Sequence, residues 1–124
     1  MNAYADVLDR LRGICLALPE AYEQLFGGHT IPTWRVNGKI FAQLEDGHHG
    51  NSRLAVWCKA PPGAQDVLVD ADPERFYRPP YVGPKGWIGV FLDVPVDWDE
   101  LDGFLRESYR MTAPKRLLRL IESG

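Results

Sequence analysis

The chain has 124 residues, of which 45% are hydrophobic and 25% are charged, a composition typical of one soluble globular domain. Its net charge is -3 and its isoelectric point is about 5.5, so the protein as a whole is not attracted to nucleic acids or to anionic membranes. Only local basic patches are left for such contacts. A chain of this length needs neither a metal nor a disulfide to bury a core.

The sequence predicts a cytoplasmic protein with no membrane partner. No apolar run approaches the ~20 residues that cross a bilayer, and the first residues, MNAYADVLDRLRG, lack the cationic start and apolar segment of a signal peptide. Without an export signal, we expect the thiols of Cys15 and Cys58 to be reduced. The oligomeric state is not predicted.

The first element is predicted to be a helix that ends before Pro19, because its apolar residues recur every three or four positions. Strand patterns follow. AYEQLFGG (21–28) is expected to be an edge strand, and TIPTWRV (30–36) and KIFAQLE (39–45) flank Asn37-Gly38, a strong hairpin signal. The loop DGHHGNS (46–52) separates the second of these strands from a further strand, RLAVWCK (53–59).

The second half mixes helices with one more strand. Residues 63–71 are expected to form a short helix, 76–87 a loop and 87–93 a strand. Asp97 and Glu100 have the spacing of a capping box at a helix start, and Pro114 suits the first turn of a last helix. We therefore expect a single α+β domain over residues 1–124, with an antiparallel sheet flanked by N-terminal and C-terminal helices.

Alternation along the strands predicts two faces of the sheet. The expected core face is aliphatic: Ile40, Ala42, Leu44, Leu54, Val56, Cys58, Ile88, Val90 and Leu92. The other face mixes aromatic with basic, polar or small residues: Lys39, Phe41, Gln43, Arg53, Ala55, Trp57, Lys59, Trp87, Gly89 and Phe91. Two interpretations stay open: the terminal helices cover this second face, or it is a partly open surface where rings stack on bases and cations contact phosphates.

No catalytic, metal or cofactor site is predicted. His29, His48 and His49 fall in glycine-rich loops without a second ligand pair at a recognised spacing. Cys15 and Cys58 lie on predicted core faces, which argues against a reactive thiol. The acidic residues near position 97 and the basic ones near position 116 suit the dipoles of helix ends, although a basic helix that contacts phosphate is the alternative for the latter.

The loop FYRPPYVGPKGW (76–87) is expected to be a rigid connector, since its three prolines restrict the unfolded chain. Phe76, ending a helical turn, and Trp87 are the expected anchors. Tyr81 is expected to project at the lip of a pocket, with Arg78 and Lys85 beside it. The aromatic side chains proposed to line that pocket are those of Trp34, Trp57, Tyr81 and Trp87.

Several segments together resemble the MmcQ/YjbR family of small bacterial proteins. They are LPE (18–20), GGHTIPTWRVNGKIFAQL (27–44), LAVWCK (54–59), RFYRPPYVGPKGWIGVFLD (75–93) and VDWDELDGFLRESYRMTAPKRL (96–117). The resemblance covers nearly the whole chain and implies a CyaY-like α+β fold, DNA binding through a double-wing motif of β-hairpins, and no catalytic residue. The wings would be the hairpins tipped by Asn37-Gly38 and by DGHHGNS.

The first hypothesis is therefore a non-enzymatic protein that binds DNA through basic hairpins, with phosphate contacts from Arg35, Lys39, Arg53 and Lys59. The alternative is a small-molecule or peptide-binding protein with an aromatic-lined pocket. A third hypothesis is an interaction module that docks a protein partner through residues 76–87. Salt separates the first from the other two, because nucleic-acid binding weakens steeply with ionic strength.

Overall fold

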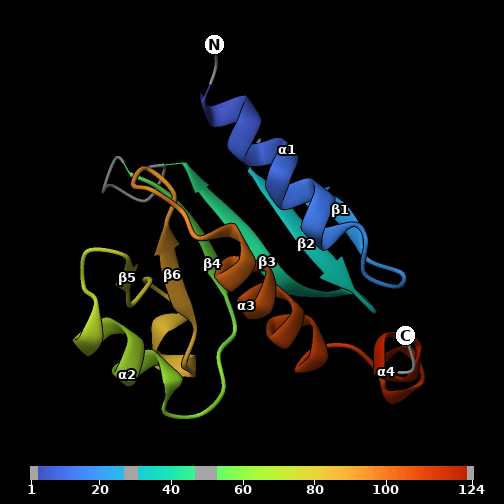
Figure 1. Cartoon of the computed structure of the whole chain (residues 1–124). Helices are drawn as coiled ribbons and strands as arrows, with labels where there is room; N and C mark the ends of the chain where they lie inside the picture. Colours follow the sequence, from blue (N-terminus) through green and yellow to red (C-terminus); the bar gives the residue numbers. More distant parts are fainter. Residues whose placement is uncertain (1–2, 27–30, 47–52, 123–124) are drawn as a thin grey trace.

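The computed structural model describes residues 3–26, 31–46 and 53–122. They form an α+β domain with an antiparallel six-stranded sheet in the order β1-β2-β3-β4-β6-β5 (Figure 1). The strands are β1 Tyr22–Leu25, β2 Pro32–Val36, β3 Lys39–Asp46, β4 Leu54–Cys58, β5 Phe76–Tyr77 and β6 Ile88–Phe91. The helices are α1 Ala3–Cys15, α2 Ala64–Ala71, α3 Trp98–Arg110, α4 Lys115–Glu122 and the 3-10 turn η1 Gly83–Lys85.

The predicted hairpin forms between β2 and β3. Asn37 and Gly38 both have positive φ, 53° and 76°, as a two-residue turn between twisted strands requires. The N-cap half of the predicted capping box is also present, because the Asp97 carboxylate accepts a hydrogen bond from the backbone N–H of Glu100 at 3.1 Å. The Glu100 carboxylate pairs with Arg75 at 2.7 Å. These local signals set the start of β3 and of α3 where the sequence predicts them.

A β-bulge corrects the predicted faces of β3. Trp34 pairs with Ala42 but the next residue, Arg35, pairs with Ile40, so that Phe41 is an extra residue on its strand. A bulge of this kind reverses the alternation of side chains beyond it. Phe41 is consequently buried in the core, and Ile40 lies on the opposite face, although the alternation alone predicts the reverse.

The core lies on one face of the sheet, against α1 and α3 (Figure 1). The rest of the predicted aliphatic face is confirmed there, apart from Leu54, which is only partly buried against the cluster. Both terminal regions add to this same core, from α1 and α3 and from Leu117 of α4. These helices therefore do not cover the opposite face of the sheet, which carries the predicted aromatic and basic side chains. The loop 76–87 lies beside that face, because Tyr81, Val82 and Lys85 line a cavity together with Trp57 and Lys59.

Residues 76–87 are anchored as the sequence predicts. Phe76 is 1% exposed and Trp87 8%, whereas Tyr81 is 75% exposed. Phe76 ends a helical turn, because its backbone N–H donates to the carbonyl oxygen of Asp72 at 3.1 Å, and it also begins the short edge strand β5, where it pairs with Val90. The Gln65 side-chain amide on α2 donates to the carbonyl oxygens of Gly83 (2.7 Å) and Trp87 (2.6 Å), which fixes the loop to that helix.

Both cysteines are buried in the core, as predicted. Burial raises the pKa of each thiol, in the case of Cys58 to about 12. Since the thiolate is the reactive form, we expect a water-soluble thiol reagent to label both slowly in the native protein and rapidly in denaturant. A colorimetric thiol assay measures this. Rapid native labelling of Cys58 would mean that β4 presents this residue to solvent.

No described helix is both long enough and apolar enough to cross a membrane.

Candidate functional site

A cavity of about 750 Å³ lies between the β2–β3 hairpin and the loop 76–87. We call it the aromatic–basic cavity, after four rings, Phe26, Trp57, Tyr81 and Trp87, and four cations, Arg35, Lys39, Lys59 and Lys85. The remaining residues that line it are Gly38, Ile40, Gln43 and Val82. Its size is in the range of small-molecule sites, and it has the aromatic lining with a few polar groups that such sites share.

Trp57 is held in place by the edge strand β5. Its indole N–H donates to the hydroxyl oxygen of Tyr77 at 2.6 Å, and the ring of Tyr77 stacks on Phe91 with centroids 4.5 Å apart. The ring of Tyr77 lies over Gly89, where a Cβ would collide with it. The glycine is therefore required for Tyr77 to cover this face of the sheet and to fix Trp57 beside the cavity.

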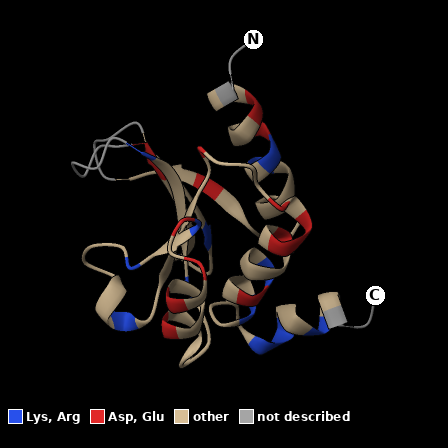
Figure 2. Ribbon diagram, turned by 60° about the vertical axis from the view of Figure 1, so that its left-hand side comes forward, with Lys and Arg blue, Asp and Glu red and all other residues tan. Residues whose placement is uncertain are grey.

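The four cations of the cavity have no ion pair with an acidic residue in the described part of the chain, unlike seven of the arginines elsewhere. No described residue that lines the cavity is acidic, and none of Arg35, Lys39, Lys59 and Lys85 has an ion pair with a described carboxylate. Elsewhere arginines pair with carboxylates: Arg12–Glu23, Arg53–Asp93, Arg75–Glu100, Arg78–Asp66, Arg106–Asp102, Arg110–Glu107 and Arg116–Glu20. Figure 2 shows that acidic and basic residues both occur on the helices of this protein, whose net charge is -3.

The pKa of Lys59 reflects the positive charge that surrounds it in the cavity. Partial burial lowers the pKa of its ammonium group, and the positive charges of Lys39 and Lys85 lower it further. Desolvation and like charges both disfavour the charged form of a lysine. The three ammonium groups are thus close enough to repel one another, and an anion placed among them would relieve that repulsion.

The two site hypotheses from the sequence meet in this one cavity. Six of their residues line it: Arg35, Lys39, Lys59, Trp57, Tyr81 and Trp87. The other two lie elsewhere. Trp34 is a core residue rather than a pocket residue, because its side chain faces the helices and its indole N–H donates to Glu23 at 3.0 Å. Arg53 makes a bidentate ion pair with Asp93 (2.8 and 2.7 Å) and covers the ring of Phe91.

Neither Ile40, which lines the cavity, nor Ser108, which supports it, was predicted from the sequence. Ile40 reaches the cavity only because of the bulge, and no pattern of residues in the sequence predicts that bulge. The Ser108 hydroxyl on α3 accepts from the backbone N–H of Lys59 (2.9 Å) and donates to the carbonyl oxygen of Phe41 (2.6 Å). It thus joins β3 to β4 at the bulge. A serine on the apolar face of a helix was the available signal, since a buried hydroxyl needs partners.

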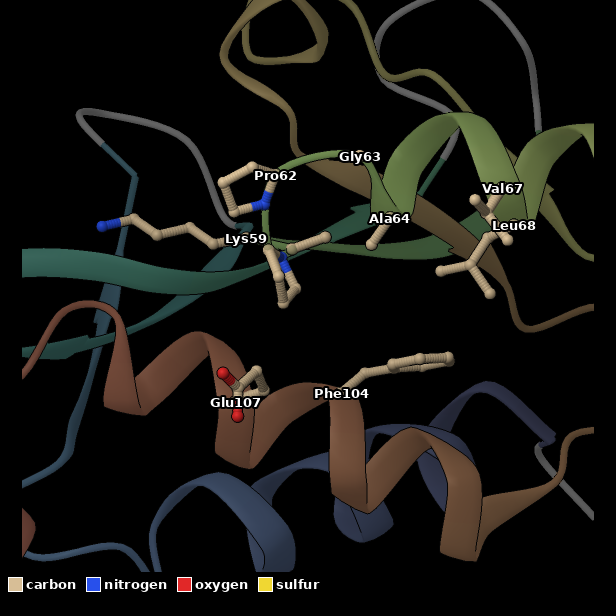
Figure 3. Close-up of a pocket in the computed structure, with 10 residues that line it drawn as sticks. Lys59, Pro62, Gly63, Ala64, Val67, Leu68, Phe104 and Glu107 are labelled. Atoms are coloured by element: carbon tan, nitrogen blue, oxygen red, sulfur yellow. The ribbon is translucent and has the colours of Figure 1, made fainter.

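A second cavity, of about 580 Å³, lies between α2 and α3 (Figure 3). Its lining is apolar apart from Lys59 and Glu107: Ala60, Pro61, Pro62, Gly63, Ala64, Val67, Leu68 and Phe104. None of the residues of α2 is buried, so this helix stands away from α3 and leaves the space open. We call it the apolar cavity.

No three His, Cys, Asp or Glu side chains in the described part of the chain are grouped so as to hold a metal ion. His29, His48 and His49, together with the hairpin tip DGHHGNS beyond Asp46, lie outside the described residues.

Known proteins share the fold of this chain, and one family model matches its sequence. The model named YjbR matches residues 16–111. The crystal structure of a Deinococcus radiodurans protein with the domain DUF419 has a TM-score of 0.72 and 24% sequence identity, over 84% of this chain and 76% of that one. At that identity the likeness shows the fold. No curated protein matches the chain.

Proposed function

The chain belongs to the YjbR family, and from that premise we propose that it is a non-enzymatic binding protein whose aromatic–basic cavity holds an anionic ligand with a planar ring. The observation that carries the proposal is the group of four cations without a described acidic partner, in a protein whose net charge is -3. Leaving like charges together costs free energy that a bound anion recovers.

The aromatic side chains of the cavity would recognise the planar ring of the ligand. Trp57 and Trp87 are nearly buried and form a fixed part of the lining, whereas Tyr81 is exposed at the lip. Aromatic side chains stack on planar ligand rings, which contributes about 1–3 kcal/mol per nucleic-acid base. A ligand with both a ring and an anionic group, such as a nucleotide, would use both kinds of residue at once.

DNA is the second candidate, and the position of two cations favours it. Arg35 and Lys39 flank the exposed turn Asn37-Gly38, the arrangement expected of a basic wing. A nucleotide within a strand presents the same ring and phosphate as a free nucleotide, so the cavity would take one unit of the chain. The acidic net charge limits any further attraction of a duplex to this hairpin.

A titration at low salt with a mononucleotide, a single-stranded oligonucleotide and a duplex tests both candidates. For a strand, Arg35→Ala and Lys39→Ala are each expected to weaken binding across all sequences and to flatten the dependence of log affinity on log salt by about one unit. The change in tryptophan fluorescence or in probe anisotropy measures binding. Lys115→Ala is the matched control, because this exposed lysine on α4 lies outside the cavity.

The outcomes separate the two ligands. Tight, salt-steep binding of strands with weak binding of the mononucleotide supports DNA, and the reverse supports a small ligand. An equal loss of affinity in Lys115→Ala would show that binding follows overall charge rather than the cavity. If no ligand binds even at millimolar protein concentration, the proposal fails.

A further inference from the structure

Lys59 has an unusual position, because it lines both cavities. It directly follows β4, and its backbone N–H donates to the hydroxyl oxygen of Ser108 at 2.9 Å. That hydroxyl in turn donates to Phe41 of β3. The base of the lysine side chain is thus fixed to the sheet and to α3, which limits where its amine can reach.

The amine points away from the apolar cavity. Figure 3 shows the Lys59 side chain extending away from Phe104 on α3 and from Leu68 on α2. Only the aliphatic stem of the lysine borders the apolar side chains, as long charged side chains commonly arrange themselves. The nitrogen is therefore on the side of the aromatic–basic cavity.

The charged groups around this amine are nearly all positive. They come from β2, β3 and η1, in the form of Arg35, Lys39 and Lys85. Glu107 on α3 is the one acidic residue among the described residues that line either cavity. Its carboxylate interacts with the guanidinium of Arg110 at 3.4 Å, and it has no ion pair with Lys59.

These surroundings favour the neutral amine of Lys59. Partial burial, then Lys39, then Lys85 lower the pKa of its ammonium group. A lysine that is desolvated or placed beside other cations is the usual form of a nucleophilic lysine, because only the neutral amine attacks a carbonyl carbon. Lys115 on α4, by contrast, is exposed to solvent.

We propose that Lys59 is a reactive amine that forms a reversible imine with an aldehyde carried by an anionic aromatic ligand in the cavity. The inference rests on the proposed function. Tyr81, whose ring is exposed, would stack on the ligand's ring, with Trp57 and Trp87 as the fixed wall behind it, and Arg35, Lys39 and Lys85 would hold the anionic group. The neutral nitrogen adds to the aldehyde carbon, and the resulting carbinolamine loses one water, so that the C=N bond replaces the C=O bond without any oxidant or reductant.

Pyridoxal 5′-phosphate is a suitable probe, since it combines a planar ring, a phosphate and an aldehyde. The protein is mixed with less than one equivalent, the imine is followed by its absorbance, reduced with borohydride, and located by peptide mass spectrometry. Lys59 is expected to be labelled at least about tenfold faster than Lys115, because a bound aldehyde reacts as if intramolecularly. Labelling of Lys59 should also continue to a lower pH than is usual for a lysine, because the pKa of its ammonium group is lowered.

Two further measurements keep the inference separate from the proposed function. Lys59→Arg keeps the cation but loses the nucleophile, so the absorbance and the label should disappear without moving to Lys39 or Lys85. Pyridoxine 5′-phosphate, which has an alcohol in place of the aldehyde, should bind the unmodified protein and compete with labelling.

If pyridoxine 5′-phosphate binds but Lys59 is labelled no faster than Lys115, the imine is ruled out and the anion-binding function stands. If neither this compound nor any nucleotide or strand binds, the function itself fails, and the inference with it.

Discussion

Replacement of Trp87 by alanine is expected to lower the free energy of unfolding by about 3–5 kcal/mol, the cost of truncating a buried aromatic residue. The indole is 8% exposed at the start of β6. The backbone carbonyl of Trp87 also accepts from Gln65, so a shift of the backbone would loosen the loop from α2. Urea denaturation measures the loss as a lower midpoint with an unchanged slope.

Tyr81→Ala is the matched control from the same loop. Tyr81 is 75% exposed, and substitutions at the surface usually change stability by no more than about 0.5 kcal/mol. It should instead reduce ligand binding, because its ring forms the lip of the cavity. If Tyr81→Ala unfolds the protein while Trp87→Ala has no effect, the anchor and the lip have been assigned the wrong way round.

Ser108→Ala has the second largest expected effect on stability, a loss of about 2–4 kcal/mol. The hydroxyl serves two backbone groups at once, the N–H of Lys59 and the carbonyl of Phe41. Its removal leaves both without this partner in the interior, and an unsatisfied buried polar group costs about 1–3 kcal/mol. Alanine itself suits a helix at least as well as serine, so the loss comes from the sheet.

Glu107→Ala provides the comparison on the same helix, since its partly exposed side chain makes no hydrogen bond to the sheet. Thermal unfolding of the two variants should differ clearly. Ser108→Ala should also free the backbone of Lys59, which amide hydrogen exchange would detect as faster exchange at this residue. Equal melting temperatures for both variants would show that the hydroxyl does not hold β3 to β4.

Much of the fold could be predicted from local signals. The Asn37-Gly38 turn, the edge strand β1 and the Asp97 cap each depend on the residues within a few positions, and each is present. The bulge at Phe41 is different, because it is decided by packing. The ring of Phe41 packs edge to face against Tyr109, 68 positions later in the sequence, with ring centroids 5.6 Å apart. The pattern of residues within β3 cannot predict a contact with so distant a residue.

The sequence predicted the cations and the aromatic residues of the site as two separate sets, but not that both line the same cavity. The alternation of strands puts Trp57 and Lys59 on one face, which the sequence allows one to expect. Whether a cation is available for a ligand depends on distant partners: Arg53 pairs with Asp93, forty positions away. In the sequence, Arg53 cannot be distinguished from Arg35 or the cavity lysines. Only the folded structure shows which cations are paired with carboxylates and which are not.

The prolines that stiffen the loop also bear on self-association. The edge strand β5 has two residues, and Pro79 and Pro80 follow it after Arg78. A proline has no N–H to give to a neighbouring strand, and short edge strands resist pairing with other sheets. The segment that walls the cavity therefore also caps this border of the sheet, so that a second copy of the chain finds almost no exposed ladder there on which to add its own strand.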